Sequence, residues 1–213
     1  MFNKLQYISQ GATAIEQYNN IYEALDAGCR WVQLRFKNAL PVEITALSEK
    51  VKKLCAGYAA TFIINDHPHI AKQVDADGVH LGLEDTSIKE AKTIVGNKII
   101  GGTANTIAHV LQRVEEGCSY IGLGPFRFTT TKEKLSPILG LEGYAAILNE
   151  LSKQQIEIPI YAIGGIVAED ITDIIKTGVY GVAVSGIIKH HPDKKLLLQQ
   201  LNTSLYETIN HSW

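Results

Sequence analysis

Hydrophobic residues along the chain gather in eight short runs, separated by longer segments of mixed polarity. Most runs are rich in isoleucine and valine and lack polar alternation, which is typical of parallel strands covered on both faces. The runs lie at residues 4–9, 31–36, 61–65, 78–81, 98–103, 120–123, 159–163 and 180–184. Apolar residues at helical spacing occupy segments between and after them, such as 42–55, 106–116, 141–153, 168–176 and 194–209. The pattern therefore predicts alternating strands and helices.

One phrase recurs along the chain, in "LDAGCRWVQLR", "VDADGVHLG", "VEEGCSYIGLG" and "IKTGVYGVAVSG". Each phrase reads as the end of an amphipathic helix, a glycine suited to a left-handed C-cap, and a short strand. Eight such units in 213 residues average about 27 residues each, which predicts a (β/α)₈ TIM barrel as a single domain over residues 1–213. An open doubly wound sheet is the alternative, but such sheets usually have five or six strands.

Composition and charge narrow the partners and the compartment. The formal net charge is −2 and the basic residues are spread evenly, so no broad basic face is expected for nucleic acid or a membrane surface. Cys29, Cys55 and Cys118 are widely spaced, which favours free thiols in a reducing compartment. The amino-terminal segment lacks an apolar signal core, and no run approaches the ~18 apolar residues of a membrane span. We expect a cytoplasmic protein, and the pattern leaves a homo-oligomer open.

Polar and charged side chains follow the second predicted strand, in "WVQLRFK". Gln33, Arg35 and Lys37 stand at alternate positions, so an extended chain points all three toward the same side. Cationic side chains directed into the top of a barrel need anionic partners. We therefore expect an anionic ligand here, with a salt-bridged structural lining as the alternative.

Carboxylates follow the next two predicted strands. Asn65 and Asp66 end the third strand in "IINDH", and Asp85 follows the fourth in "GVHLGLED". Two carboxylates at neighbouring strand ends can bind Mg²⁺, which is commonly held by one or two carboxylates together with substrate phosphates. Helix N-capping is the alternative for Asp85, because "EDTS" precedes a helical segment. His80 is interpreted as hydrogen-bonded at the barrel top, and its role is left open.

Glycines follow the seventh and eighth predicted strands, in "AIGGI" and "VSGII". Gly164 and Gly165 precede a helix, and Ser185 and Gly186 precede a short turn. Bare glycine backbone allows N–H groups to approach an anion closely, and a helix start adds a favourable dipole. Because barrels of this kind bind phosphate at the same two places, the motifs predict a phosphate site. The alternative is that the glycines only relieve crowding.

A polar segment, "FRFTTTKEKLSP", follows the sixth predicted strand at residues 126–137. It has no helical or strand period, and Thr129, Thr131 and Lys132 offer hydroxyl donors and a positive charge at the barrel mouth. We expect this segment to form a lid that brings Lys132 to the ligand. The alternative is a solvated surface loop.

Taken in order, these motifs resemble the thiamine phosphate synthase family over nearly the whole chain. The resemblance is carried by "QLRFK", "IIND", "ADGVHLGLED", "GPFRFTTTK", "LGLEG", "AIGGI" and "GVAVSGI". It implies an enzyme that joins hydroxymethylpyrimidine diphosphate to a thiazole phosphate with Mg²⁺. The products would be thiamine phosphate and pyrophosphate, formed by a dissociative displacement.

The resemblance also implies a role for each matching position. Gln33 matches the residue that orients the pyrimidine, and Asp66 and Asp85 match the Mg²⁺ ligands. The implied diphosphate ligands are Arg35, Lys37, Asn65 and Lys132, together with Thr103, which stands where the family more often has serine. The positions associated with the thiazole phosphate are Thr129, Thr131, Gly164, Val184 and Ser185. Arg35, Lys37 and Lys132 would stabilise the departing diphosphate.

Two other functions compete with this interpretation. The related thiazole tautomerase has a histidine where this chain has Pro125, and it typically loses part of the acid pair and lysine set. Here Asp66, Asp85 and Lys132 are all present. A non-catalytic phosphate-binding barrel is the second alternative, but a sensor needs no clamp for a leaving group.

Overall fold

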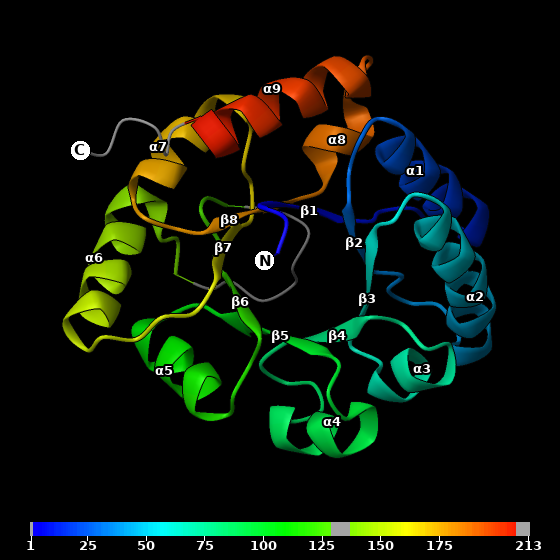
Figure 1. Cartoon of the computed structure of the whole chain (residues 1–213), viewed down its shortest axis with the longest axis horizontal. Coiled ribbons are helices and arrows are strands. Elements are labelled where there is room, and N and C mark those ends of the chain that lie inside the picture. The colour runs from blue at the N-terminus through cyan, green and yellow to red at the C-terminus, as the bar shows by residue number, and fades with distance from the viewer. Residues whose placement is uncertain (1, 129–136, 208–213) are drawn as a thin grey trace.

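The computed structural model describes residues 2–128 and 137–207. Eight parallel strands follow one another in chain order around a closed barrel, in which β1 pairs with both β2 and β8. The strands are β1 (Leu5–Ile8), β2 (Trp31–Leu34), β3 (Thr61–Asn65), β4 (Gly78–Leu81), β5 (Ile99–Ala104), β6 (Tyr120–Leu123), β7 (Ile160–Ile163) and β8 (Gly181–Val184). Figure 1 views this ring of strands end-on. The predicted (β/α)₈ barrel is confirmed.

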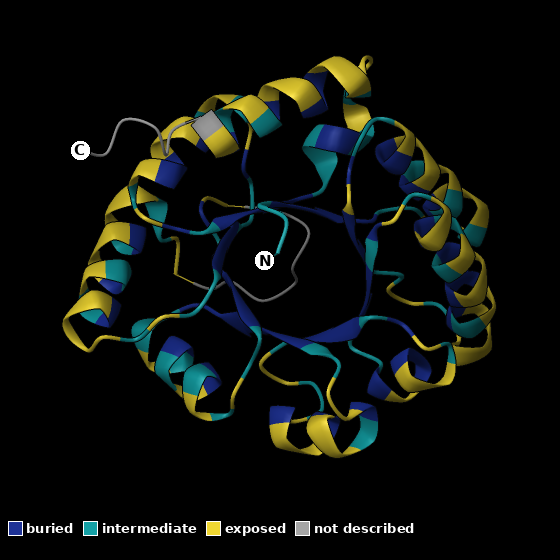
Figure 2. Ribbon diagram, viewed as in Figure 1, coloured by how far each residue is buried: buried dark blue, intermediate teal, exposed yellow. Residues whose placement is uncertain are grey.

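Helices surround the strands as an outer ring (Figure 1). They are α1 (Ala14–Asp26), α2 (Pro41–Gly57), α3 (Pro68–Gln73), α4 (Ile88–Val95), α5 (Ile107–Glu115), α6 (Gly140–Lys153), the 3₁₀ turn η1 (Ala168–Asp170), α7 (Ile171–Lys176), α8 (Gly186–His190) and α9 (Lys194–Glu207). Figure 2 shows their outer faces exposed and the strands buried. The short helix α8 replaces the turn that the sequence predicted after the eighth strand, because Ile188 of this segment is buried. No helix within the described part of the chain is long and apolar enough to cross a membrane.

Successive strand residues alternate between two hydrophobic cores, as the pleat of a strand requires. Val32 belongs to the larger core between the barrel and the helices. Trp31, Tyr120 and Tyr161 belong to a smaller core inside the barrel, and all three are fully buried. The ring of Phe2 closes over this layer, with its centroid 5.0 Å from that of Trp31. The amino-terminal end of the barrel is therefore filled with aromatic side chains.

The recurring phrase folds largely as its pattern predicts. Gly28, Gly117 and Gly178 follow helices with positive φ values of 112°, 75° and 96°. The second phrase differs, because Asp75 takes the left-handed conformation with φ 53° and Gly78 lies inside β4. Aspartate tolerates this conformation better than most residues. Gly78 is needed for packing instead, because a Cβ there would collide with the backbone of β5.

Candidate active site

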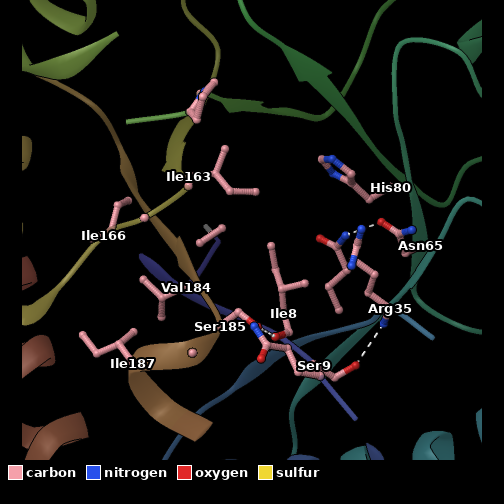
Figure 3. Close-up of a pocket in the computed structure, with 18 of the residues that line it drawn as sticks. Ile8, Ser9, Arg35, Asn65, His80, Ile163, Ile166, Val184, Ser185 and Ile187 are labelled. Atoms are coloured by element: carbon pink, nitrogen blue, oxygen red, sulfur yellow. Dashed lines mark hydrogen bonds between the residues drawn. The ribbon is translucent and has the colours of Figure 1, made fainter. Parts of the chain in front are cut away.

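A cavity of about 310 Å³ opens at the carboxyl ends of the strands. Figure 3 shows two walls facing each other across it, with Arg35, Asn65 and His80 on one side and Val184 and Ser185 on the other. The cavity is lined by seven of the predicted substrate ligands, namely Gln33, Arg35, Asn65, Thr103, Gly164, Val184 and Ser185. The predicted residues Lys37, Asp66 and Asp85 do not line it.

One wall presents amide groups with fixed directions. Gln33 Nε2 donates a hydrogen bond of 2.7 Å to Asn65 Oδ1, so the Asn65 amide nitrogen can donate to another group. Gln33 Oε1 is buried and has no hydrogen-bond partner among the described residues. A buried acceptor without a partner is costly, so it is suited to receive an N–H group of a ligand. This arrangement fits the prediction that Gln33 orients a ring with an amino group.

The cationic side chains of this wall lie just beyond the end of β2. The Arg35 N–H donates to Ser9 Oγ at 2.9 Å, and the Arg35 carbonyl accepts from Gln17 Nε2 at 3.0 Å, which fixes the loop. Burial lowers the pKa of the Arg35 guanidinium, and the charge of Asp66 opposes that shift. Lys37 lies in an adjoining hollow that Arg35 also lines. Arg35 therefore lines the cavity itself, whereas Lys37 lies next to it in the adjoining hollow.

The two predicted metal carboxylates lie close together. Asp66 has a left-handed backbone, with φ 66°, and its carboxylate forms an ion pair with Lys37. Asp85 Oδ2 accepts a hydrogen bond of 2.6 Å from the Gly82 N–H, and its carboxyl group also reaches the carboxylate of Asp66. Burial, followed by this contact with Asp66, raises the pKa of Asp85. Asp85 does not cap α4, because Ser87 Oγ accepts from the Glu90 N–H at 3.2 Å.

The opposite wall is built from backbone. Gly164 and Gly165 follow β7 with φ values of 97° and 69°, where a residue with a Cβ is strained. A Cβ on Gly164 would also lie only 2.8 Å from Pro125 Cβ, in the loop after β6. Ser185 Oγ donates to the Ile8 carbonyl at 2.5 Å, so its hydroxyl proton is not available to a ligand in this conformation. An anion bound here would therefore meet mainly backbone groups.

Sequence reasoning missed the apolar part of the cavity. Ile8, Ile163, Ile166 and Ile187 line it together with the predicted polar residues. Ile8 and Ile163 end strands, whereas Ile166 follows β7 and Ile187 lies in α8. None of these positions gives a distinguishing signal, because isoleucine is equally common in the cores of the barrel. The inward alternation along β1 and β7 was the only available clue.

Three predicted ligands, Thr129, Thr131 and Lys132, lie outside the described residues, and so does most of the predicted lid. The described ends of the loop are firmly attached. The Phe126 N–H donates to the Ile163 carbonyl at 2.9 Å, and the Gly140 N–H donates to the Phe126 carbonyl at 3.0 Å. Both ends therefore lie beside β7, at the rim of the cavity.

The fold and the site define a (β/α)₈ barrel whose ligand cavity combines a cationic side-chain wall with a glycine backbone wall. Comparison with known proteins gives the family. The sequence model described as thiamine monophosphate synthase matches residues 6–188. A thiamine-phosphate synthase from Flavobacterium johnsoniae is 58% identical over 210 residues, which cover 98% of this chain and 99% of that protein. The chain belongs to the thiamine monophosphate synthase family.

Further similar proteins support the same family membership. A thiamine-phosphate synthase from Bacteroides fragilis is 48% identical over 190 residues, which cover 89% of this chain and 93% of that protein. The solved structure of a thiamine phosphate pyrophosphorylase from Pyrococcus furiosus is similar with a TM-score of 0.85 and 32% identity, covering 97% of this chain and 96% of the other. These findings confirm the resemblance seen in the sequence and the prediction of a transferase of thiamine biosynthesis.

Proposed function

We propose that this chain condenses hydroxymethylpyrimidine diphosphate with thiazole phosphate in a Mg²⁺-assisted dissociative displacement, giving thiamine phosphate and pyrophosphate. The observation that carries the proposal is a single cavity with two unlike anion-binding walls. Arg35 and Asn65 line one wall, and Gly164 and Ser185 line the other. Two differently anchored phosphate groups are what a condensation of two phosphorylated substrates requires.

The cationic wall would hold the diphosphate. Arg35 and Lys37 supply positive charge, and the Asn65 amide nitrogen is left to donate because its oxygen already accepts from Gln33. By the resemblance, Lys132 completes this set. These groups stabilise the negative charge that grows on the departing diphosphate, so they act mainly in the transition state.

The acid pair fits a magnesium ion. Two carboxylates in mutual contact carry adjacent negative charges, and oxygen donors of this kind suit a hard divalent cation. No group of three or more His, Cys, Asp or Glu side chains is placed to hold a metal in residues 2–128 and 137–207, so water and diphosphate oxygens would complete the shell. Asp66 and Asp85 would hold the ion, which neutralises charge on the leaving group when bound.

The remaining residues would position the two rings. Gln33 Oε1 would accept a hydrogen bond from the amino group of the pyrimidine, whose electrons stabilise positive charge on the exocyclic carbon. Ile8 and Ile163 exclude water from that cation. Gly164, Val184 and Ser185, with Thr129 and Thr131, would bind the thiazole phosphate so that its ring nitrogen faces this carbon. No protein base is needed, so positioning dominates the rate.

The cysteines support a cytoplasmic location for this enzyme. All three are free, and burial raises the thiol pKa of Cys29 to about 11 and that of Cys55 to about 12. Thiols of this kind stay protonated and take no part in the proposed chemistry. Free thiols are compatible with a reducing compartment. The partners of the enzyme would be its small-molecule substrates.

A coupled assay of pyrophosphate release tests the proposed function. We expect release only when both substrates and Mg²⁺ are present, with thiamine phosphate formed in equal amount. Omission of either substrate is the control. Isomerisation of a thiazole without release of pyrophosphate would instead identify a tautomerase, and binding without turnover would identify a phosphate-binding sensor.

A further inference from the structure

Three neighbouring strands place a histidine and a tyrosine in contact inside the barrel. Gly101 of β5 lies between His80 of β4 and Tyr120 of β6 in the strand register. Because the middle residue has no side chain, the two rings meet above it, with His80 Nδ1 3.0 Å from Tyr120 Oη. A Cβ on Gly101 would lie 2.5 Å from His80 Nδ1 and would also collide with the ring of Tyr120. Gly101 therefore makes this contact possible.

The contact is part of a longer chain of hydrogen bonds. Gln6 Nε2 donates to Tyr120 Oη at 3.1 Å, and at the other end His80 Nε2 lies 3.1 Å from Thr103 Oγ1. Thr103 stands two residues beyond Gly101 on β5, so it faces the same side one layer higher and lines the cavity. This series of hydrogen bonds runs from the closed part of the barrel to the cavity, and all four side chains in it are buried. Figure 3 shows His80 at the cavity wall, beside Asn65.

The Gln6 amide, at the lower end of this series, determines which atom donates in each of its hydrogen bonds. Among the described residues, Gln6 and His80 are the two hydrogen-bond partners of the Tyr120 hydroxyl. Since the Gln6 amide donates to this hydroxyl, the tyrosine proton is directed to His80 Nδ1. Burial raises the pKa of Tyr120, so the hydroxyl keeps that proton. His80 Nδ1 then accepts, and a neutral imidazole carries its own proton on Nε2.

The upper end of this series of hydrogen bonds reaches the cavity through Thr103. A hydroxyl that accepts from His80 Nε2 must direct its own proton elsewhere, and the open side of Thr103 is the cavity. We propose that His80, as the Nε2-protonated tautomer, is a positioning residue that fixes Thr103 as a hydrogen-bond donor to an anionic oxygen of the ligand. That this oxygen belongs to the diphosphate rests on the proposed function. A donor oriented before the reaction loses less freedom when charge develops on that oxygen.

Nitrogen-15 NMR of the imidazole groups tests the direction of the chain without any reference to activity. We expect the His80 ring to show a protonated Nε2 and an unprotonated Nδ1, with its signals assigned by their loss in His80→Gln. A ring protonated on Nδ1 would overturn the proposal, because Thr103 would then donate to His80 and could only accept from the ligand.

Binding of pyrophosphate with Mg²⁺, measured by calorimetry on the full chain, tests whether His80 and Thr103 act together on an anionic ligand. Thr103→Val should weaken binding about tenfold, the usual effect of losing one hydrogen bond to a charged group. His80→Leu should weaken it by a similar factor, and the double variant should be no worse than either single one. His80→Gln keeps an N–H donor near the position of Nε2 and should stay within about threefold of the parent. Additive effects in the double variant would overturn the proposal.

Two tyrosines inside the barrel provide a matched control. Tyr120→Phe should weaken binding of pyrophosphate several-fold, whereas Tyr161→Phe should not change it, because Tyr161 Oη donates to the Asn3 carbonyl at the other end of the barrel. Thermal unfolding of each variant shows whether it is folded. If His80→Leu does not fold, the tyrosine pair and the NMR measurement on the parent still decide the matter.

The two proposals can fail separately. If both substrates yield pyrophosphate but Tyr120→Phe and Tyr161→Phe bind it equally well, the role of His80 is wrong and the function stands. If no pyrophosphate is released while the tautomer and the coupling between His80 and Thr103 are as expected, the function is wrong and the positioning role stands.

Discussion

The two ends of the barrel are built from the same strands, but they differ in their side chains and in the polar groups that lack a partner. At the amino-terminal end, Trp31, Tyr120 and Tyr161 pack edge to face, with centroids 5.0 to 5.6 Å apart, and both tyrosine hydroxyls have hydrogen-bond partners within the protein. At the carboxyl end, Gln33 Oε1 lacks a partner among the described residues, and Asp85 has a raised pKa beside a second carboxylate. Of these three closed-end side chains only the Trp31 indole N–H lacks a partner among the described residues, whereas the open end leaves an amide oxygen and an acid pair for a ligand.

Because of this difference, the closed end contributes mainly to folding stability and the open end mainly to the proposed chemistry. Side chains at the closed end contribute buried apolar area and cost little electrostatically. Asp85 at the open end costs folding free energy while it is ionised, because it is partly buried and lies against the carboxylate of Asp66. Substitutions at the closed end should therefore change unfolding, and substitutions at the open end should change turnover.

The largest effect is expected from Trp31→Ala. Trp31 is fully buried within the aromatic layer, and truncation of such a side chain costs about 3–5 kcal/mol of unfolding free energy. Chemical denaturation measures this loss, while the KM values of the folded fraction should stay near those of the parent. Trp31→Phe is the matched control. It should cost much less, because it keeps an aromatic ring and removes a buried indole N–H that has no partner among the described residues.

The next effect concerns the acid pair at the open end. Asp66→Asn or Asp85→Asn should lower kcat by roughly three decades, about 4 kcal/mol, because the Mg²⁺ that neutralises the leaving group is held less well. Steady-state kinetics over a range of Mg²⁺ concentrations measure the loss, and denaturation should show a folded protein. Glu84→Gln, next to Asp85 but exposed, is a control for a simple change of charge. Unchanged dependence on Mg²⁺ in both aspartate variants would contradict the metal site.

Much of the fold was predictable because buried parallel strands leave a strong signal. Strands β3, β4 and β6 have the predicted bounds, since polar or glycine residues flank β4 and β6, and the apolar run of β3 lies between Thr61 and Asn65. The second strand was predicted too long. It ends at Leu34, because the Arg35 backbone forms hydrogen bonds with the side chains of Ser9 and Gln17 and not with a neighbouring strand.

The position of a residue at the cavity was predictable where its type is unusual for a strand end, as with Gly164. The role of a residue was not predictable where it depends on a distant partner. The role inferred for His80 depends on Tyr120 and on the absence of a side chain at Gly101, residues that the strand register brings together. A pattern along one strand contains no information about hydrogen-bond direction across three strands.

A smaller effect on turnover is expected from Lys132→Ala. This prediction comes from the sequence alone, because Lys132 lies outside the described residues. Loss of one charge that stabilises the departing diphosphate should lower kcat about a hundredfold, roughly 3 kcal/mol, with less change in substrate binding. Single-turnover kinetics separate the two quantities. Lys134→Ala is the control from the same loop, and equal activity of both variants would show that Lys132 has no special role.

The smallest effect is a gain in stability at the open end. Because the folded state raises the pKa of Asp85, it binds that proton more tightly than the unfolded chain does. The contribution of this group is therefore fully present below its unfolded pKa of about 3.9 and is lost as the pH rises through the folded pKa. At neutral pH without Mg²⁺, Asp85→Asn should remove the repulsion with Asp66 and raise Tm by about 1–2 °C.

The pH and the metal distinguish this gain from a general effect of the amide. Below the unfolded pKa of about 3.9 the Tm difference should vanish, because the carboxyl group of the parent is then protonated in both states and as neutral as the amide. Saturating Mg²⁺ at neutral pH should reverse the order, since the ion stabilises the parent by mass action and has lost a ligand in the variant. Calorimetric scans with and without a chelator measure all three conditions. A variant that is more stable at every pH, with or without Mg²⁺, would show that Asp85 does not hold the ion and that the open end carries no cost of this kind.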